Sequence, residues 1–264
     1  MDAITRRTAL TACLAAGVRA CAGSLVACGA VRPAARSSTT KVHVMGTIHG
    51  RHRTSSAYSL DRLNAAILKA NPDVILTEIP PGRVAKAFET YKATGQVDEA
   101  RTNVFPEYTD VIIPLAVDQG WRVLGTAAWT PEVARARRMA LKSIELNPAR
   151  SAQWAEHRAA IREFVQKVRG KSDDPRFIHT AEFDRLVAKS REPYARYFDA
   201  DLGRGGWSQI NEAHNNLIEE ALNMLSGQGL RVLITFGTAH KYKIRERLAA
   251  RDDLALEDTR SLFA

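Results

Sequence analysis

Along most of the chain, short apolar runs alternate with longer segments in which apolar residues recur at helical spacing. This order is expected when strands and helices follow one another. Short apolar runs bounded by Gly, Pro or charged residues predict buried parallel strands at residues 41–45, 73–79, 121–126, 231–236 and 254–257. Apolar residues at helical spacing predict helices at residues 58–70, 84–94, 108–119, 210–225 and 242–250. The pattern therefore predicts an α/β fold with a central, mainly parallel sheet.

Residues 130–200 differ from the rest of the chain because their period is helical and no strand pattern interrupts them. They are also rich in arginine and lysine. We expect a helical insertion that caps the sheet, either as a lid over a site or as a solvated layer, and the composition does not choose between these. We expect His157 and His179, which lie in this segment, at the surface.

The first 28 residues have the pattern of an export signal. Arg6 and Arg7 precede a weakly apolar stretch that ends in Leu25-Val26-Ala27-Cys28, which resembles a bacterial lipobox with Cys28 as the lipidated residue. The paired arginines also resemble a twin-arginine signal. A transmembrane anchor is the alternative, but it needs about 20 uncharged apolar residues, and Arg19 interrupts the stretch.

Three segments follow from this interpretation: a signal peptide with a lipobox at 1–28, a flexible tether at 29–40, and an α/β domain at 41–264. We expect the mature protein in the periplasm or cell envelope, attached to the membrane by its lipid. All three cysteines lie within residues 1–28, so the domain itself has no disulfide, thiol nucleophile or thiolate metal site.

The net charge of +9 changes this picture little. Removal of residues 1–27 takes away three arginines and one aspartate, which leaves +7. No run of Lys and Arg is interleaved with aromatic residues, so we expect a solvated basic surface and no nucleic-acid partner.

The tetrad Gly-Thr-x-His occurs twice, at residues 46–49 and 237–240, each time directly after a predicted strand. Ligands bind beyond the carboxyl ends of parallel strands, so His49 and His240 are expected at one edge of the sheet. Glu78 ends the second strand, where a carboxylate needs a partner. That partner is either the two imidazoles or, in the simpler case, a basic residue such as Arg83.

Two imidazoles and one carboxylate are suitable ligands for Zn, Mn or Co with an open position for water. The sequence therefore predicts a metal-assisted hydrolase that acts on a peptide or ester bond of a peptide or small-molecule substrate. Without a metal, one His as base with Glu78 as its orienting partner would support the same acyl hydrolysis.

The order strand, GTxH, helix and strand recurs, which indicates a degenerate internal duplication, with Glu257 in the position of Glu78. The two tetrads, Glu78 and Arg83 five residues later resemble the TraB, Tiki and ChaN-like superfamily over residues 41–126 and 207–260. The resemblance implies an α/β fold from a duplicated unit, with the GxxH histidines and the glutamate in the site.

The same resemblance leaves the chemistry open. Some members are metal-dependent peptidases, others are haem-related lipoproteins, and erythromycin-esterase-like relatives use histidine without metal. A noncatalytic protein that binds haem or a metal, and an inactive relic, are therefore alternatives to the hydrolase.

Many members carry an Arg-Asn pair at the start of the long helix before the last GxxH unit. Here Asn211 is retained and the arginine is absent, and Arg83 or His214, one turn from Asn211, could replace it in binding an oxyanion. His52, in the first loop, is a candidate supporting residue. The predicted catalytic set is Glu78, His49, His240, Arg83, Asn211 and His214, and the predicted metal ligands are His49, Glu78 and His240.

Overall fold

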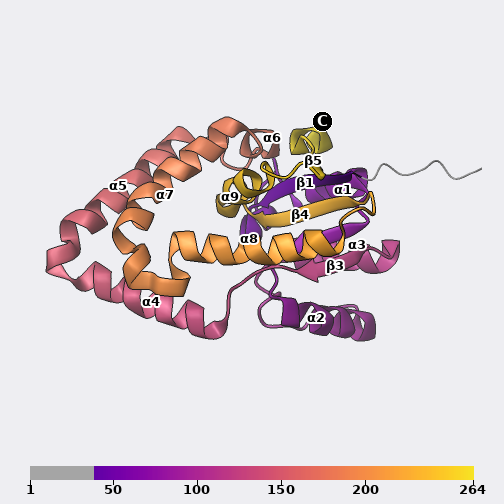
Figure 1. Cartoon of the computed structure of the whole chain (residues 1–264), viewed down its shortest axis with the longest axis horizontal. Helices are drawn as coiled ribbons and strands as arrows, with labels where there is room; N and C mark the ends of the chain where they lie inside the picture. Colours follow the sequence, from indigo (N-terminus) through magenta and orange to yellow (C-terminus); the bar gives the residue numbers. More distant parts are fainter. Residues whose placement is uncertain (1–38) are drawn as a thin grey trace, which may run out of the picture. The chain divides into compact units, whose positions relative to one another are not determined.

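The computed structural model describes residues 39–264 (Figure 1). The expected signal peptide, Cys28 and residues 29–38 of the expected tether lie outside this range. The first strand begins at Thr40, so the last residue of the predicted tether belongs to the sheet. In the described part of the chain, no helix has the length and apolar character needed to cross a bilayer.

Five parallel strands form one sheet in the order β3-β2-β4-β1-β5. This confirms the predicted α/β fold with a parallel sheet. The strands are β1 (Thr40–Thr47), β2 (Val74–Thr77), β3 (Arg122–Gly125), β4 (Arg231–Gly237) and β5 (Leu254–Leu256).

Alternate residues of the strands face two separate hydrophobic clusters. Val42, Val44 and Ile234 pack on one face, while Met45 and Ile75 pack on the other. Because successive side chains of a strand point to opposite faces, a strand that is apolar at every position must be covered on both sides. This explains the uninterrupted apolar runs in the sequence.

Helices cover both faces of the sheet. Apolar residues of α8 and α9 join the cluster of Val42, and those of α1 and of the segment before β3 join the cluster of Met45. The bounds are α1 (Leu60–Ala70), α2 (Pro81–Thr94), η2 (Glu107–Ile112), α3 (Ile113–Gln119), α8 (Trp207–Met224) and α9 (Thr238–Leu248). The turn η2 is a π-helix, a form that is common at functional sites.

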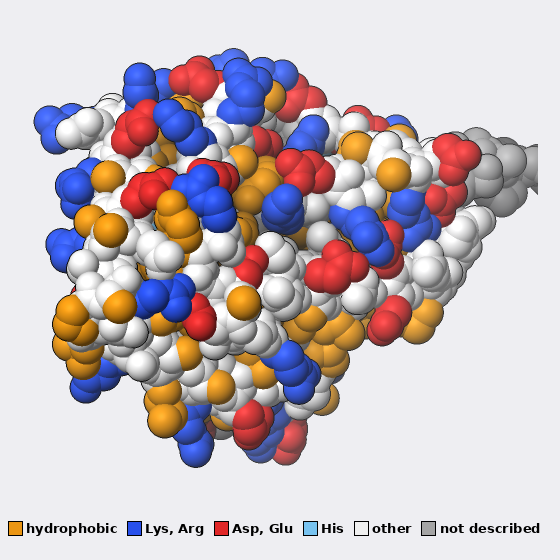
Figure 2. All heavy atoms as spheres, turned by 60° about the vertical axis from the view of Figure 1, so that its left-hand side comes forward, with side chains coloured by type: hydrophobic (Ala, Val, Ile, Leu, Met, Phe, Trp, Pro, Cys, Tyr) orange, Lys and Arg blue, Asp and Glu red, His pale blue; other side chains and the backbone are white. Residues whose placement is uncertain are grey.

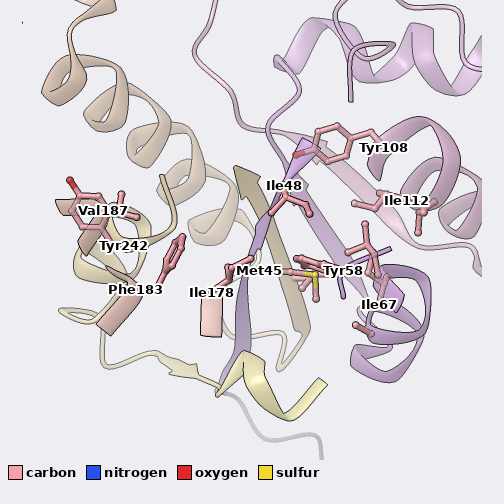
Figure 3. Packing of buried hydrophobic residues seen from close by; sticks show 14 of the residues in the cluster. Met45, Ile48, Tyr58, Ile67, Tyr108, Ile112, Ile178, Phe183, Val187 and Tyr242 are labelled. Atoms are coloured by element: carbon pink, nitrogen blue, oxygen red, sulfur yellow. The ribbon is translucent and has the colours of Figure 1, made fainter. Parts of the chain in front are cut away.

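The insertion is helical, as predicted, and Figure 1 shows it beside the sheet. It consists of α4 (Pro131–Leu146), α5 (Ser151–Lys167), α6 (Pro175–Ile178) and α7 (Ala181–Leu202), and the turn η4 (Gly203–Gly205) leads into α8. In Figure 3, Ile178, Phe183 and Val187 of the insertion lie on one side of Met45, and Tyr58 and Ile112 lie on the other. The insertion therefore shares the core of the sheet.

The surface expectation for His179 is wrong. Its Nδ1 donates to the carbonyl of Pro175 at 2.5 Å, and its ring stacks on Phe263. A helical period alone does not show which residues meet the sheet, and His179 is on the side that does.

Charged residues of both signs share the surface. Figure 2 shows Lys and Arg next to Asp and Glu on the face it presents, with no continuous basic patch there. On the insertion, Lys189 pairs with Glu163 at 2.7 Å and Arg150 with Asp201 at 2.8 Å. Such exposed pairs contribute little to stability, but they lower the local field that a nucleic acid would meet.

One buried ion pair connects the insertion to the sheet. Lys241 of α9 has a side chain that is 1% exposed, and it pairs with Asp184 of α7. A buried ammonium group without a counterion is strongly unfavourable. This pair therefore fixes α7 beside the helix that carries the second GTxH tetrad.

We predict that Asp184→Ala lowers the free energy of unfolding by about 3–5 kcal/mol, because it leaves Lys241 buried without a partner. Lys241→Met should cost less, since the Asp184 carboxylate is more exposed than the Lys241 ammonium and its bare charge can be hydrated. Urea unfolding of both variants measures the difference. Equal losses in the two variants would show that the pair has no such role.

Candidate functional site

Three neighbouring strands bring the predicted residues to one place. His49 follows β1, His240 follows β4, and Glu78 follows β2, and β4 lies between the other two. His49 Nε2 is 3.9 Å from Glu78 Oε2, and His240 Nε2 is 4.0 Å from Glu78 Oε1. The two imidazoles therefore face the same carboxylate.

The glycines of the two tetrads permit this approach. A Cβ on Gly46 would lie 3.2 Å from Thr238 Cα, and a Cβ on Gly237 would lie 2.5 Å from His49 Nε2. Neither glycine has a positive φ, but His49 does, at 52°. The tetrad glycines are thus required for close packing rather than for turning the chain, and the unusual backbone conformation belongs to the histidine.

Glu107 supports the ring of His49, although no motif in the sequence marks it as a site residue. His49 Nδ1 donates to Glu107 Oε1 at 2.6 Å, and Thr47 Oγ1 donates to the same oxygen at 2.9 Å. Glu107 is fully buried at the start of η2. In the sequence, Glu107 is notable only as a charged residue directly before the predicted helix at 108–119.

Asn211 supports His240 in the same way. His240 Nδ1 donates to Asn211 Oδ1 at 2.8 Å, and Asn211 Nδ2 donates to the carbonyl of Trp207 at 2.7 Å. The second bond fixes the amide orientation, so the oxygen must face the imidazole. The Trp207 ring stacks on the His240 ring with centroids 5.0 Å apart.

Backbone and phenol groups hold Glu78. The Gly237 amide donates to Glu78 Oε2 at 2.8 Å. Tyr108 accepts from the Glu78 amide and donates to the carbonyl of Thr235, both at 2.9 Å. Glu78 is therefore held by β4 and η2, and no ion pair with Arg83 is needed to explain its burial.

Two further histidines shape the first loop. His52 accepts from the Ile48 amide at 3.0 Å and donates to the carbonyl of Tyr58 at 2.8 Å, so it holds the backbone next to His49, and its support of the site stays a prediction. His179 Nε2 accepts from the Gly46 amide at 2.9 Å. The insertion thus contacts the first tetrad directly.

Arg83 and Glu257 lie away from the two imidazoles. Arg83 pairs with Glu99 at 3.5 Å, in a neighbouring pocket. Glu257 hydrogen-bonds through its amide to the carbonyl of Val42, near the start of β1, so it does not occupy the position that Glu78 has in the first unit.

His214 does face the site. Its Nδ1 accepts from the Ala128 amide at 2.9 Å, and its ring lies 5.2 Å from that of His240. Its buried Nε2 has no hydrogen-bond partner in the described residues. Burial, followed by the charge of Arg101, lowers the pKa of His214 to about 3, so the ring stays neutral.

The two site histidines have opposite pKa shifts. Burial disfavours a charged His49, but its hydrogen bond to Glu107 and the charges of Glu107 and Glu78 outweigh this, so its pKa is raised above 6.5. Burial lowers the pKa of His240 well below 6.5, and His214, Arg191 and His49 lower it further. Burial also raises the pKa of Glu78. One imidazole thus favours the cation and the other the neutral form.

The donor chemistry fits a divalent cation. Both Nδ1 atoms are hydrogen-bonded to oxygen acceptors, and the Nε2 atoms face a carboxylate, as in histidine metal sites. Two ligands of a tetrahedral zinc ion lie roughly 3.3 Å apart, whereas the contacts here are 3.9 and 4.0 Å. Within residues 39–264, no three His, Cys, Asp or Glu side chains meet the spacing of a metal centre. The right ligand types are therefore present, set wider apart than in a closed coordination shell.

Comparison of the chain with protein-family models, curated proteins and solved structures finds no match. The function of the site must therefore be inferred from its own geometry.

We predict that Glu107→Gln lowers the pKa of His49, because the variant loses the charge that favours the imidazolium while burial remains. A raised pKa means that this group stabilises the fold below its unfolded pKa of about 6.5 and ceases to do so as the pH rises through the folded pKa. The variant should lose that contribution. NMR titration of the His49 ring measures the shift, with the exposed Glu145→Gln as control. An unchanged titration would contradict this role of Glu107.

Proposed function

We propose that the chain is a metal-assisted hydrolase of a peptide or ester bond in the bacterial cell envelope. His49, Glu78 and His240 would hold a Zn, Mn or Co ion. The observation that carries this proposal is the approach of both Nε2 atoms to one buried carboxylate at the ends of adjacent strands. When bound, the ion would polarise the acyl carbonyl and lower the pKa of a water molecule.

The residues behind the site prepare both imidazoles for this task. Glu107 and Asn211 accept from the two Nδ1 atoms, so each ring carries its proton on Nδ1 and keeps a lone pair at Nε2. The rings are also held in fixed planes, which lowers the cost of orienting ligands during the reaction. A cavity of about 410 Å³ lies over both histidines, within the size range of small-ligand sites.

Metal-free hydrolysis is the second candidate, and two observations favour it: the wide ligand spacing and the opposite pKa shifts of the two histidines. In this form of the hypothesis, His240 acts in its neutral form and accepts a proton from water at Nε2, and His49 acts in its protonated form and stabilises the oxyanion. Environments that separate two pKa values commonly assign an acid and a base.

The remaining alternative is a noncatalytic lipoprotein that binds haem or a metal. It rests on the resemblance to the TraB, Tiki and ChaN-like superfamily, which remains a proposal based on the two tetrads, Glu78 and Arg83. The location in the cell envelope rests on the sequence of residues 1–28. Neither the resemblance nor the location in the cell envelope depends on a contact observed within residues 39–264.

Elemental analysis of the protein purified without a histidine tag is the direct test. We expect bound divalent metal in the wild type, and its loss in both His49→Ala and His240→Ala with the fold retained. His43→Ala is the control, because His43 lies in β1 away from both tetrads. Since protons compete for Nε2, metal content should rise with pH. Normal metal content in either site variant would overturn the proposed ligands.

Hydrolysis of ester and peptide libraries separates the candidates. Loss of turnover after chelation, and its return with metal, supports the metal-assisted reaction. Turnover that survives chelation but requires His49 and His240 supports the metal-free reaction. A Soret shift on haem titration without any turnover supports the binding protein.

We also predict that Gly237→Ala reduces hydrolysis by at least about 100-fold, because displacement of a reacting group by roughly 1 Å has such an effect. The new methyl group would lie 2.5 Å from His49 Nε2, and His49, with a side chain 37% exposed, would move outward. Gly50→Ala is the matched control, since a Cβ there meets no atom within 4 Å. Equal activity of the two variants would show that the position of His49 is unimportant.

A further inference from the structure

The cavity over His49 and His240 has a wall rich in arginine. Arg51, Arg137 and Arg191 line it, and none of its lining residues is Asp or Glu. Two of these arginines come from the insertion, Arg137 from α4 and Arg191 from α7. The insertion therefore supplies charge to the wall of the site, in addition to covering it.

The insertion arginines contact aromatic rings instead of carboxylates. The Arg191 guanidinium lies 4.9 Å from the centre of the Trp207 ring, and that of Arg137 lies 5.8 Å from the centre of the Tyr194 ring. Across residues 39–264, neither arginine has an ion-pair partner. Other arginines of the insertion do have one, for example Arg150 with Asp201.

Arg191 is also incompletely hydrogen-bonded. Its Nε is buried and has no hydrogen-bond partner in the described part of the chain. Burial, opposed in part by Tyr194 and reinforced by the neighbouring Arg137, lowers the pKa of Arg191. Two neighbouring guanidinium groups, one of them with a buried and unpaired Nε, and neither with a counterion in the described residues, are unfavourable for the fold alone. An anionic ligand between them would remove this cost.

Arg191 lies near His240. The Arg191 guanidinium and the His240 ring each lie about 5 Å from the Trp207 ring, so they are no more than about 10 Å apart. A negatively charged group at Arg191 would thus lie within about 10 Å of His240, a separation that a small substrate can span.

We propose that Arg137 and Arg191 bind an oxyanion group of the substrate, a carboxylate or a phosphate, and thereby position its acyl bond over His49 and His240. Guanidinium groups bind both oxyanions through charge-assisted hydrogen bonds. The positioning part of this inference rests on the proposed hydrolase, whereas the anion site itself does not. The substrate class is then a small anionic ester or a peptide with a free carboxylate near the scissile bond.

Anion binding can be measured without catalysis. Trp207 and Trp129 line the cavity, so their fluorescence reports occupancy. The full chain, treated with a chelator so that no metal can bind the anion, is titrated with inorganic phosphate and separately with acetate. We expect saturable binding of at least one anion, weakened about tenfold or more in both Arg191→Gln and Arg137→Gln. Arg191→Lys should recover part of the affinity, and melting curves show whether each variant is folded.

Arg185→Gln is the matched control, because Arg185 is an exposed arginine of α7 outside this cavity. Binding that is equally weakened in Arg185→Gln would reveal nonspecific surface attraction and overturn the proposal. Wild-type affinity in the folded Arg191 and Arg137 variants, or no binding of either anion by the wild type, would overturn it as well. Tighter binding of phosphate or of acetate identifies the oxyanion.

A kinetic test separates this inference from the proposed function. The hemisuccinate and butyrate esters of p-nitrophenol differ in charge and share the reacting group. We expect Arg191→Gln to raise the KM for the hemisuccinate about tenfold. The KM for the butyrate should not change. If neither ester is hydrolysed while phosphate or acetate still binds through Arg191, the hydrolase fails and the anion site stands. If both are hydrolysed and Arg191→Gln affects them equally, the positioning role of Arg191 fails and the hydrolase stands.

Discussion

The ends of β1 and β4 lie so close together that each tetrad glycine faces residues of the other tetrad. Side chains at Gly46 or Gly237 would press on Thr238 or on His49. With hydrogen atoms there instead, the parallel pair β1 and β4 brings His49 beside Gly237 and leaves Glu78, from β2, within reach of both imidazoles. The other parts of the site are arranged around this contact between two strand ends.

A layer of buried polar groups makes the contact specific. Asn211 and Tyr108 each bond to a site residue on one side and to a backbone carbonyl on the other, and Glu107 accepts from both His49 and Thr47 at one oxygen. Polar groups in the interior are costly unless paired, and once paired they define a single arrangement. Preorganised donors and acceptors of this kind reduce the reorganisation that a reaction requires.

The insertion is better described as a wall of the cavity than as a freely moving lid. It contacts the first tetrad through His179 at the Gly46 amide and the residue after the second tetrad through Asp184 at Lys241, and its apolar residues belong to the same core as Met45 of β1. The same helices carry Arg137 and Arg191 to the cavity. The insertion thus contributes both to the stability of the fold and to the charge of the proposed anion site.

Local patterns in the sequence were enough to predict the strands, most of the helices and the edge of the sheet at which His49, Glu78 and His240 meet. Burial on both faces makes strand residues apolar, and parallel strands carry ligands beyond their carboxyl ends, so these features can be recognised in the chain itself. Asn211 was found from the resemblance to the superfamily, and helical spacing from Asn211 added His214.

Only the tertiary structure decided the strand order, which places β4 between β1 and β2. It also decided which residues reach the site from other parts of the chain. Glu107, Arg137 and Arg191 lie in segments with no motif, and their positions depend on how those segments pack. For the same reason Arg83 was placed wrongly beside the imidazoles and His179 wrongly at the surface. A periodic pattern shows which residues share a face of a helix. The element that packs against that face is determined by contacts between residues far apart in the sequence, which a local pattern cannot show.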